Sequence, residues 1–95
     1  MKNLKISAGT TAKLTTKHNV TRREIEQCFA NKAGSLLEDT RALTKTDPPT
    51  LWFISYTNEG RPLKVVYMQR GQDVHLKSAF EPNDEERRIY NKFSV

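Results

Sequence analysis

The chain has 95 residues, of which 36% are hydrophobic, and it carries a formal net charge of +5 at neutral pH. A chain of this length forms one domain over residues 1–95, which excludes a second lobe or a deeply enclosed active-site cleft. The single cysteine, Cys28, excludes an internal disulfide framework. No signal peptide or long apolar run is visible, so we expect a cytoplasmic protein without a membrane role.

The first segment predicts a short strand followed by a short helix. Leu4 and Ile6 alternate with Lys5, as the residues of a strand do. After a Gly-Thr-Thr break, a helix of about two turns is expected over residues 11–17.

A second helix should begin at Thr21 and continue to about residue 31. Thr21 and Glu24 have the spacing of a capping box, in which each side chain accepts a hydrogen bond from the other residue's backbone. Val20 and Ile25 stand at the two positions of a hydrophobic staple. His18 therefore lies at a constrained junction just before this helix.

The central part of the chain predicts strands. Leu36-Leu37 fits a short strand, and residues 39–49 form a polar loop that ends in Asp47-Pro48-Pro49. Three longer strands are expected over residues 51–57, 63–69 and 74–79, with turn-forming segments between them, which favours an antiparallel meander. In the last of these strands, Val74, Leu76 and Ser78 should share one face and His75 and Lys77 the other.

The chain should end in a third helix. Asn83 is a suitable N-cap with Glu86 three residues later, and Ile89, Tyr90 and Phe93 would form one apolar face. The order β-α-α-β-β-β-β-α predicts an α+β fold, a small antiparallel sheet meander with its helices packed on one face.

Positive charge is concentrated in particular segments. Residues 1–32 carry seven Lys or Arg against two acids, and residues 51–80 carry four against two. This distribution would attract a polyanion such as nucleic acid. Charged residues also keep small domains soluble, so the charge alone leaves both interpretations open.

Standard catalytic motifs are absent, and one Cys with two His makes no ordinary zinc site, so no metal or cofactor is expected. RNA can be cleaved without a metal when a base takes the 2′-hydroxyl proton and cations stabilise the phosphorane. Side chains suited to that chemistry, or to RNA binding alone, are Lys17, His18, Arg22, Arg23, Arg61, Lys64, Arg70, His75 and Lys77. We expect His75 and Lys77 to face a groove bordered by His18 and Arg61. An ordinary hydrogen-bonding role for either histidine stays open.

Two stretches resemble a known family. KHNVTRREIEQCF (17–29) resembles the K-H-G-V-(S/T)-x-x-E-(A/V) signature of BrnT-type toxins. NEGRPLKVVYMQRGQDVHLKSAFEPNDEERRIY (58–90) resembles their G-R-x-L-x-V-V-(Y/F) strand, the following I-x-x-S-A-R segment and the final E-x-x-x-Y helix. Order and spacing agree over roughly residues 4–93.

The resemblance implies a RelE-like endoribonuclease that cleaves RNA, inhibits translation and is neutralised by a cognate antitoxin with a DNA-binding segment. It implies catalytic roles for His18, Arg61 and Glu86, and it matches Tyr90 to the tyrosine of the last helix. A homodimer is also compatible with it.

The chain departs from the family pattern at the last strand. Phe80 replaces the basic residue of S-A-R, His75 stands where arginine is frequent, and Ser7-Ala8-Gly9 replaces a W-D pair. Lys77 or His75 could supply the missing charge. The alternative function is a non-catalytic nucleic-acid-binding or protein-binding module on the same scaffold.

Overall fold

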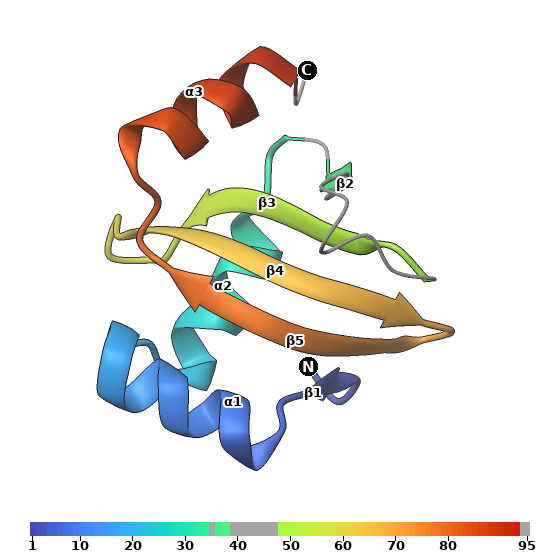
Figure 1. Cartoon of the computed structure of the whole chain (residues 1–95). Coiled ribbons are helices and arrows are strands. Elements are labelled where there is room, and N and C mark those ends of the chain that lie inside the picture. Colours follow the sequence, from blue (N-terminus) through green and yellow to red (C-terminus); the bar gives the residue numbers. More distant parts are fainter. Residues whose placement is uncertain (35, 39–47, 94–95) are drawn as a thin grey trace.

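The computed structural model describes residues 1–34, 36–38 and 48–93, and these form a five-stranded mixed sheet with three helices and a π-helical turn (Figure 1). The elements are β1 (Leu4–Lys5), α1 (Ala8–Lys13), the π-helical turn η1 (Leu14–His18), α2 (Arg22–Asn31), β2 (Leu37–Glu38), β3 (Thr50–Tyr56), β4 (Pro62–Arg70), β5 (Asp73–Phe80) and α3 (Asp84–Phe93). The predicted α+β class and order of elements are confirmed. Most of the polar loop predicted over residues 39–49 lies outside the described residues.

The sheet has the strand order β1-β5-β4-β3-β2. Strands β2 to β5 form the predicted antiparallel meander, but β1 pairs with β5 in parallel, with Leu4 opposite Val74 and Lys5 opposite His75. The expectation of a purely antiparallel sheet was therefore wrong at this edge. A parallel neighbour requires a long crossover connection, and alternation within a two-residue strand does not reveal its direction.

The first helix begins three residues earlier than predicted. The Ser7 hydroxyl accepts a hydrogen bond from the N–H of Thr10 at 3.2 Å, which caps α1 and draws Gly9 into the helix instead of a break. The helix continues into η1, where it ends at Asn19 in the left-handed conformation with φ of 51°. Asparagine tolerates this conformation better than most residues do.

The start of α2 is as the sequence predicts. Thr21 Oγ1 accepts from the N–H of Glu24 at 3.1 Å, and Glu24 Oε1 accepts from the N–H of Thr21 at 3.0 Å. Val20 and Ile25, the two staple residues, are both buried. The entry to this helix is therefore fixed by local contacts.

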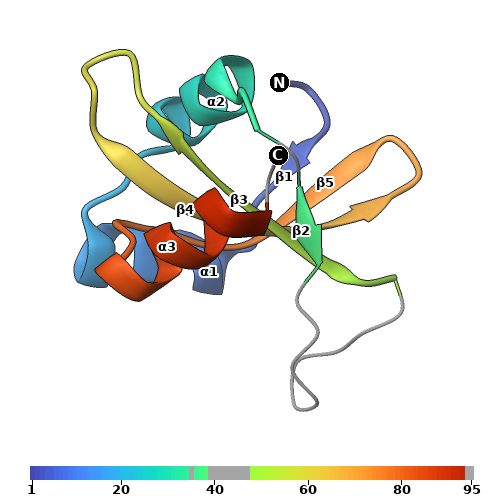
Figure 2. The same ribbon diagram turned by 90° about the horizontal axis from the view of Figure 1, so that it is seen from above.

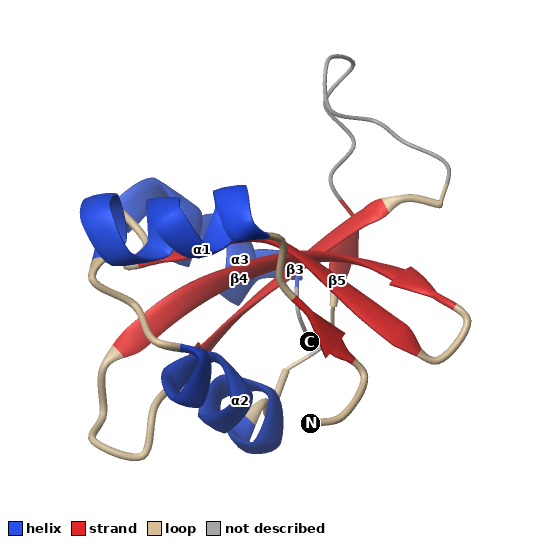
Figure 3. Cartoon of the chain, turned by 90° about the horizontal axis from the view of Figure 1, so that it is seen from below, coloured by secondary structure: helices blue, strands red, loops and turns tan. Residues whose placement is uncertain are grey.

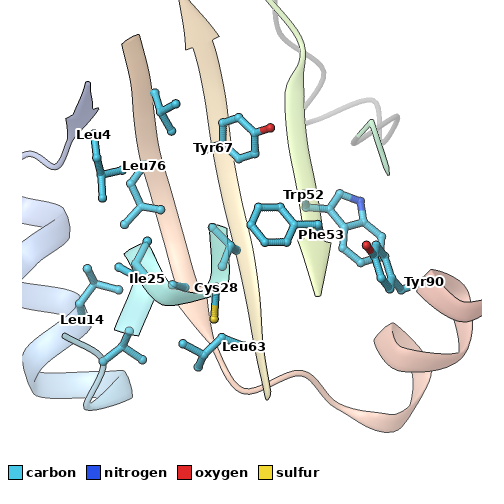
Figure 4. Packing of buried hydrophobic residues seen from close by; sticks show 14 residues of the cluster. Leu4, Leu14, Ile25, Cys28, Trp52, Phe53, Leu63, Tyr67, Leu76 and Tyr90 are labelled. Atoms are coloured by element: carbon cyan, nitrogen blue, oxygen red, sulfur yellow. The ribbon is translucent and has the colours of Figure 1, made fainter. Parts of the chain in front are cut away.

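The helices cover both faces of the sheet (Figures 2 and 3). Phe53 of β3 packs against Phe29 of α2, with ring centroids 5.0 Å apart. Trp52, the preceding residue on β3, packs against Tyr90 of α3 at 5.7 Å. Successive residues of a strand point to opposite faces, so α2 and α3 lie on opposite sides, and Figure 4 shows Phe53 and Trp52 pointing in opposite directions. The prediction of helices on a single face was wrong.

Helix α3 packs less completely than predicted. Asn83 Oδ1 accepts from the N–H of Glu86 at 2.8 Å, so the predicted cap is confirmed. Of the expected apolar face only Tyr90 is buried, whereas Ile89 and Phe93 remain 38% and 59% exposed. The helix meets the sheet mainly at Trp52 of β3, which packs against Tyr90.

A β-bulge in β5 changes the expected alternation. Ser78 pairs with Val66 and Leu76 with Tyr67, so Lys77 has no partner on β4. Because of the extra residue, each side chain after it points to the opposite face of the sheet from the one that simple alternation predicts. Ser78 consequently lies on the His75 face, which corrects its predicted place beside Val74 and Leu76.

Candidate functional site

A groove of about 510 Å³ runs along the β1–β5 edge of the sheet. It is lined by Leu4, Lys5, Ile6, Ser7, Thr10, Arg22, His75, Leu76 and Lys77. The lining includes three Lys or Arg residues and a histidine but no carboxylate. This groove is open and shallow, as expected for a chain of this length.

The groove residues are brought together by strand pairing. Lys5 and His75 are direct partners in the parallel β1–β5 ladder, so their side chains share one face. Lys77 is the unpaired residue of the β5 bulge and is exposed to solvent. Bulges often redirect a side chain, and this one places a lysine two residues from His75 at the groove.

Arg22 closes the groove on the α2 side. Its Nη2 donates to the carbonyl oxygens of Met1 at 2.9 Å and Leu4 at 3.0 Å, and its Nε donates to Glu26 at 2.9 Å. These bonds tie β1 to α2. The charge of Arg22 is largely offset by Glu26, so Lys5 and Lys77 are the cations available to a ligand.

Arg61 joins its own turn, between β3 and β4, to three other segments of the fold. Its guanidinium donates to the carbonyl oxygens of His18 (3.0 Å) and Asn19 (2.8 Å), to Glu24 (3.0 Å) and to Glu81 (3.1 Å). The β3–β4 turn is thereby connected to η1, α2 and the end of β5. Charged groups with this many partners are held rigidly, and Arg61 has little capacity left for a phosphate.

The carboxylate of Glu24 is held in its charged form. Burial alone would raise its pKa, but hydrogen bonds from the N–H of Thr21 and from Arg61, with the Arg61 charge, outweigh burial and hold the pKa below its ordinary value. The pKa of Arg61 is raised: burial opposes this, and the two carboxylates Glu24 and Glu81 outweigh it. This pair belongs to the framework of the fold.

Glu86 and Lys64 form a second structural pair. Lys64 Nζ donates to Glu86 at 2.7 Å and lies 4.5 Å from the centre of the Trp52 ring. Glu86 also accepts from the N–H of Asn83 at the start of α3. The Lys64 side chain is only 14% exposed, so it stabilises the α3 side of the sheet and offers little charge to RNA.

His18 contacts the C-terminal end of β5. Its half-buried ring packs against Phe80, the last residue of β5, with centroids 5.5 Å apart and an interplanar angle of 37°. His75 is five residues earlier on the strand, which corresponds to roughly 16 Å at a rise of about 3.3 Å per residue. The groove lining includes His75 and Lys77 but neither His18 nor Arg61, so the structure brings together two of the four residues predicted to share it.

The remaining predicted RNA-binding residues are dispersed. Lys17 in η1, Arg23 in the first turn of α2 and Arg70 at the end of β4 are all exposed. They do not line the groove. Arg22 is the predicted RNA-binding residue that does.

Cys28 belongs neither to the groove nor to the contact between His18 and Phe80. It is fully buried under the sheet, and burial, with a smaller contribution from the charge of Glu24, raises the pKa of its thiol to about 11. A thiol in this state is a poor nucleophile near neutral pH.

The described segments 1–34, 36–38 and 48–93 contain no group of three or more His, Cys, Asp or Glu placed to hold a metal ion. Within the same part of the chain, no helix has the length and apolar character needed to cross a membrane.

Sequence reasoning missed Lys5, Ser7 and Thr10 as groove residues and Phe80 as the partner of His18. Alternation around Lys5 predicts that it points away from the core, but its proximity to His75 depends on a pairing between distant segments. Phe80 stood out as a departure from the family pattern, and no spacing connected it to His18.

Comparison with known proteins identified no relative: no family model, no curated protein and no solved structure matches this chain.

Proposed function

We propose that this protein binds single-stranded RNA through the β1–β5 groove and cleaves it without a metal, as a RelE-like toxin. The observation that supports this most is the groove itself, where Lys5, His75 and Lys77 converge without an acidic side chain. Such a lining attracts phosphate because no acidic residue of the lining opposes the positive charge of its lysines. The toxin assignment comes from the BrnT-type sequence resemblance.

The proposed reaction uses residues of the groove. His75 takes the proton of a 2′-hydroxyl, whose oxygen attacks the adjacent phosphorus as the bond from phosphorus to the 5′-oxygen breaks. Lys5 and Lys77 stabilise the charge of the phosphorane, and a lysine ammonium gives the leaving oxygen its proton. The products are a 2′,3′-cyclic phosphate and a 5′-hydroxyl.

The test is cleavage of a labelled single-stranded RNA in the presence of a chelator, compared among the wild type, His75→Ala and Lys77→Ala. Each variant should lose activity by about a hundredfold or more, the usual effect of removing an acid–base group or a charge partner of the transition state. Arg88→Ala with Lys92→Ala on α3 is the matched control, because both are exposed cations away from the groove. Equal activity of His75→Ala and wild type would contradict this mechanism.

A non-catalytic RNA-binding module is the second candidate. Arg61 and Glu86, two of the five residues expected to be catalytic, are engaged in structural ion pairs. Wild-type protein that binds RNA but cleaves none, with or without ribosomes, would establish this function. Binding to about four phosphates should then give a slope near −3 for log affinity against log salt, whereas no binding would reject both candidates.

The toxin role has its own test. Expression of the wild type should arrest growth, and the product of an adjacent reading frame with a DNA-binding segment should restore growth. Cells that express Lys77→Ala should grow normally without that partner.

A further inference from the structure

The rings of His18 and Phe80 form a half-buried contact outside the core. Neither ring belongs to the buried core, and both are half-buried, so part of each remains accessible to solvent. The rings come from η1 and from the end of β5, which are far apart in the sequence. They present an aromatic surface at the C-terminal end of β5, three residues beyond Lys77 of the groove.

This aromatic surface is held in place before any ligand binds. The carbonyl oxygen of His18 accepts from Arg61 at 3.0 Å, and Arg61 is itself fixed by Glu24 and Glu81. Lys64 Nζ lies 5.7 Å from the centre of the Phe80 ring. A preorganised surface binds with a smaller entropy loss than a mobile one.

The rings also lie on the same side of the sheet as the groove histidine. Phe80 pairs with Lys64, Ser78 with Val66 and His75 with Met68, and these β4 residues share one face. The bulge at Lys77 is what brings Phe80 onto the face of His75. A nucleic-acid strand that follows β5 from the groove would therefore reach this aromatic surface.

We propose that His18 and Phe80 form a stacking platform for an unpaired base of the RNA whose phosphates occupy the β1–β5 groove. The inference rests on the proposed function and deepens it, because it defines the substrate as RNA with an unstacked base. Phe80 carries no charge and cannot hold phosphate, whereas aromatic rings stack on bases of any type. Lys17, exposed beside His18, would accompany the backbone.

The test compares two probes by fluorescence anisotropy: a single-stranded RNA and an abasic ribose-phosphate oligonucleotide of the same length. Phe80→Ala should weaken binding of the RNA by about 5- to 150-fold, which corresponds to the loss of one stacked base. Binding of the abasic oligonucleotide should not change. The salt slope of RNA binding should also match that of the wild type, because no phosphate contact is removed.

Two further variants separate stacking from folding. Phe80→Trp keeps an aromatic face and should bind RNA at least as tightly as the wild type does. Phe93→Ala removes an exposed aromatic ring from α3 and should have no effect. Thermal unfolding of each variant confirms that the protein is folded at the temperature of the binding assay.

Three results would overturn the inference, and they are distinguishable. Unchanged RNA affinity in folded Phe80→Ala rejects the platform while the groove proposal stands. An equal loss for both probes assigns Phe80 to the structure of the groove instead of base stacking. Wild-type protein that binds neither probe rejects the proposed function, and the platform falls with it.

Discussion

The two faces of the sheet are covered to different extents. On the face under α2 lie four residues with no exposed surface, Phe53, Leu63, Val65 and Ala79. On the opposite face of β3 to β5, Thr50, Trp52 and Met68 are buried, whereas five residues remain half-buried: Ile54, Lys64, Val66, Ser78 and Phe80. The comparison indicates that the α2 face is packed more completely, whereas the other face also carries accessible polar and aromatic groups.

The largest loss of stability is expected for Phe53→Ala. The side chain is fully buried between β4 and α2, so its removal should lower the free energy of unfolding by about 3–5 kcal/mol through lost burial and a cavity. Urea denaturation measures the loss. Tyr56→Ala on the same strand, 53% exposed, should change stability by only about 0.5 kcal/mol. Similar losses for the two variants would remove the contrast between buried and exposed positions.

A neighbouring pair of valines tests the two faces directly. Val65 is fully buried on the α2 face and Val66 is half-buried on the other. Val65→Ala should lower stability by about 2 kcal/mol and Val66→Ala by about half as much, because less apolar surface returns to water. Since the residue type and the strand are the same, equal losses in denaturant titrations would mean that the faces are equally packed.

The Arg61–Glu24 pair connects the elements around the sheet. It should make the free energy of unfolding depend on pH in the acidic range. The folded protein lowers the pKa of Glu24 below its ordinary value of 4.5, so the stabilisation is present above that pH and is lost as pH falls through the folded pKa. Glu24→Gln should lower stability at neutral pH by about 1 kcal/mol and flatten the decline below pH 4.5. Parallel curves of unfolding free energy against pH for the two proteins would argue against this role.

The smallest effect on stability should come from Lys77→Ala. Lys77 is exposed and unpaired in the bulge, so the free energy of unfolding should change by about 0.5 kcal/mol or less. RNA affinity should fall, and the salt slope should decrease by about 0.7 because one phosphate contact is lost. Lys92→Ala on α3 is the control and should leave the slope unchanged. A large loss of stability in Lys77→Ala would place this lysine in the framework instead of the groove.

Local features of the fold were predictable because their causes are local. The capping box of Thr21 and Glu24, the cap at Asn83 and the meander of β3 to β5 depend on residues close together in the sequence. The parallel pairing of β1 and the division of helices between two faces depend on contacts between distant segments. Neither follows from periodicity.

The candidate site shows the same limit. His75 and Lys77 were recognised from their chemistry, but the bulge that separates them from simple alternation was not. Arg61 and Glu86 have side chains suited to catalysis, and only the structure shows that their partners are already present. Residue type indicated which groups could react, and packing decided which remain available.

The parallel pairing of β1 with β5 has a consequence for how the protein folds. Leu4 meets Val74, 70 positions later in the sequence, only after a long loop has closed, and the ladder between the two strands has only two residue pairs. Such long-range contacts form late in folding and open readily in the native state. Amide hydrogens of β1 should therefore exchange faster than those of β4, and the groove should be the last part of the molecule to assemble.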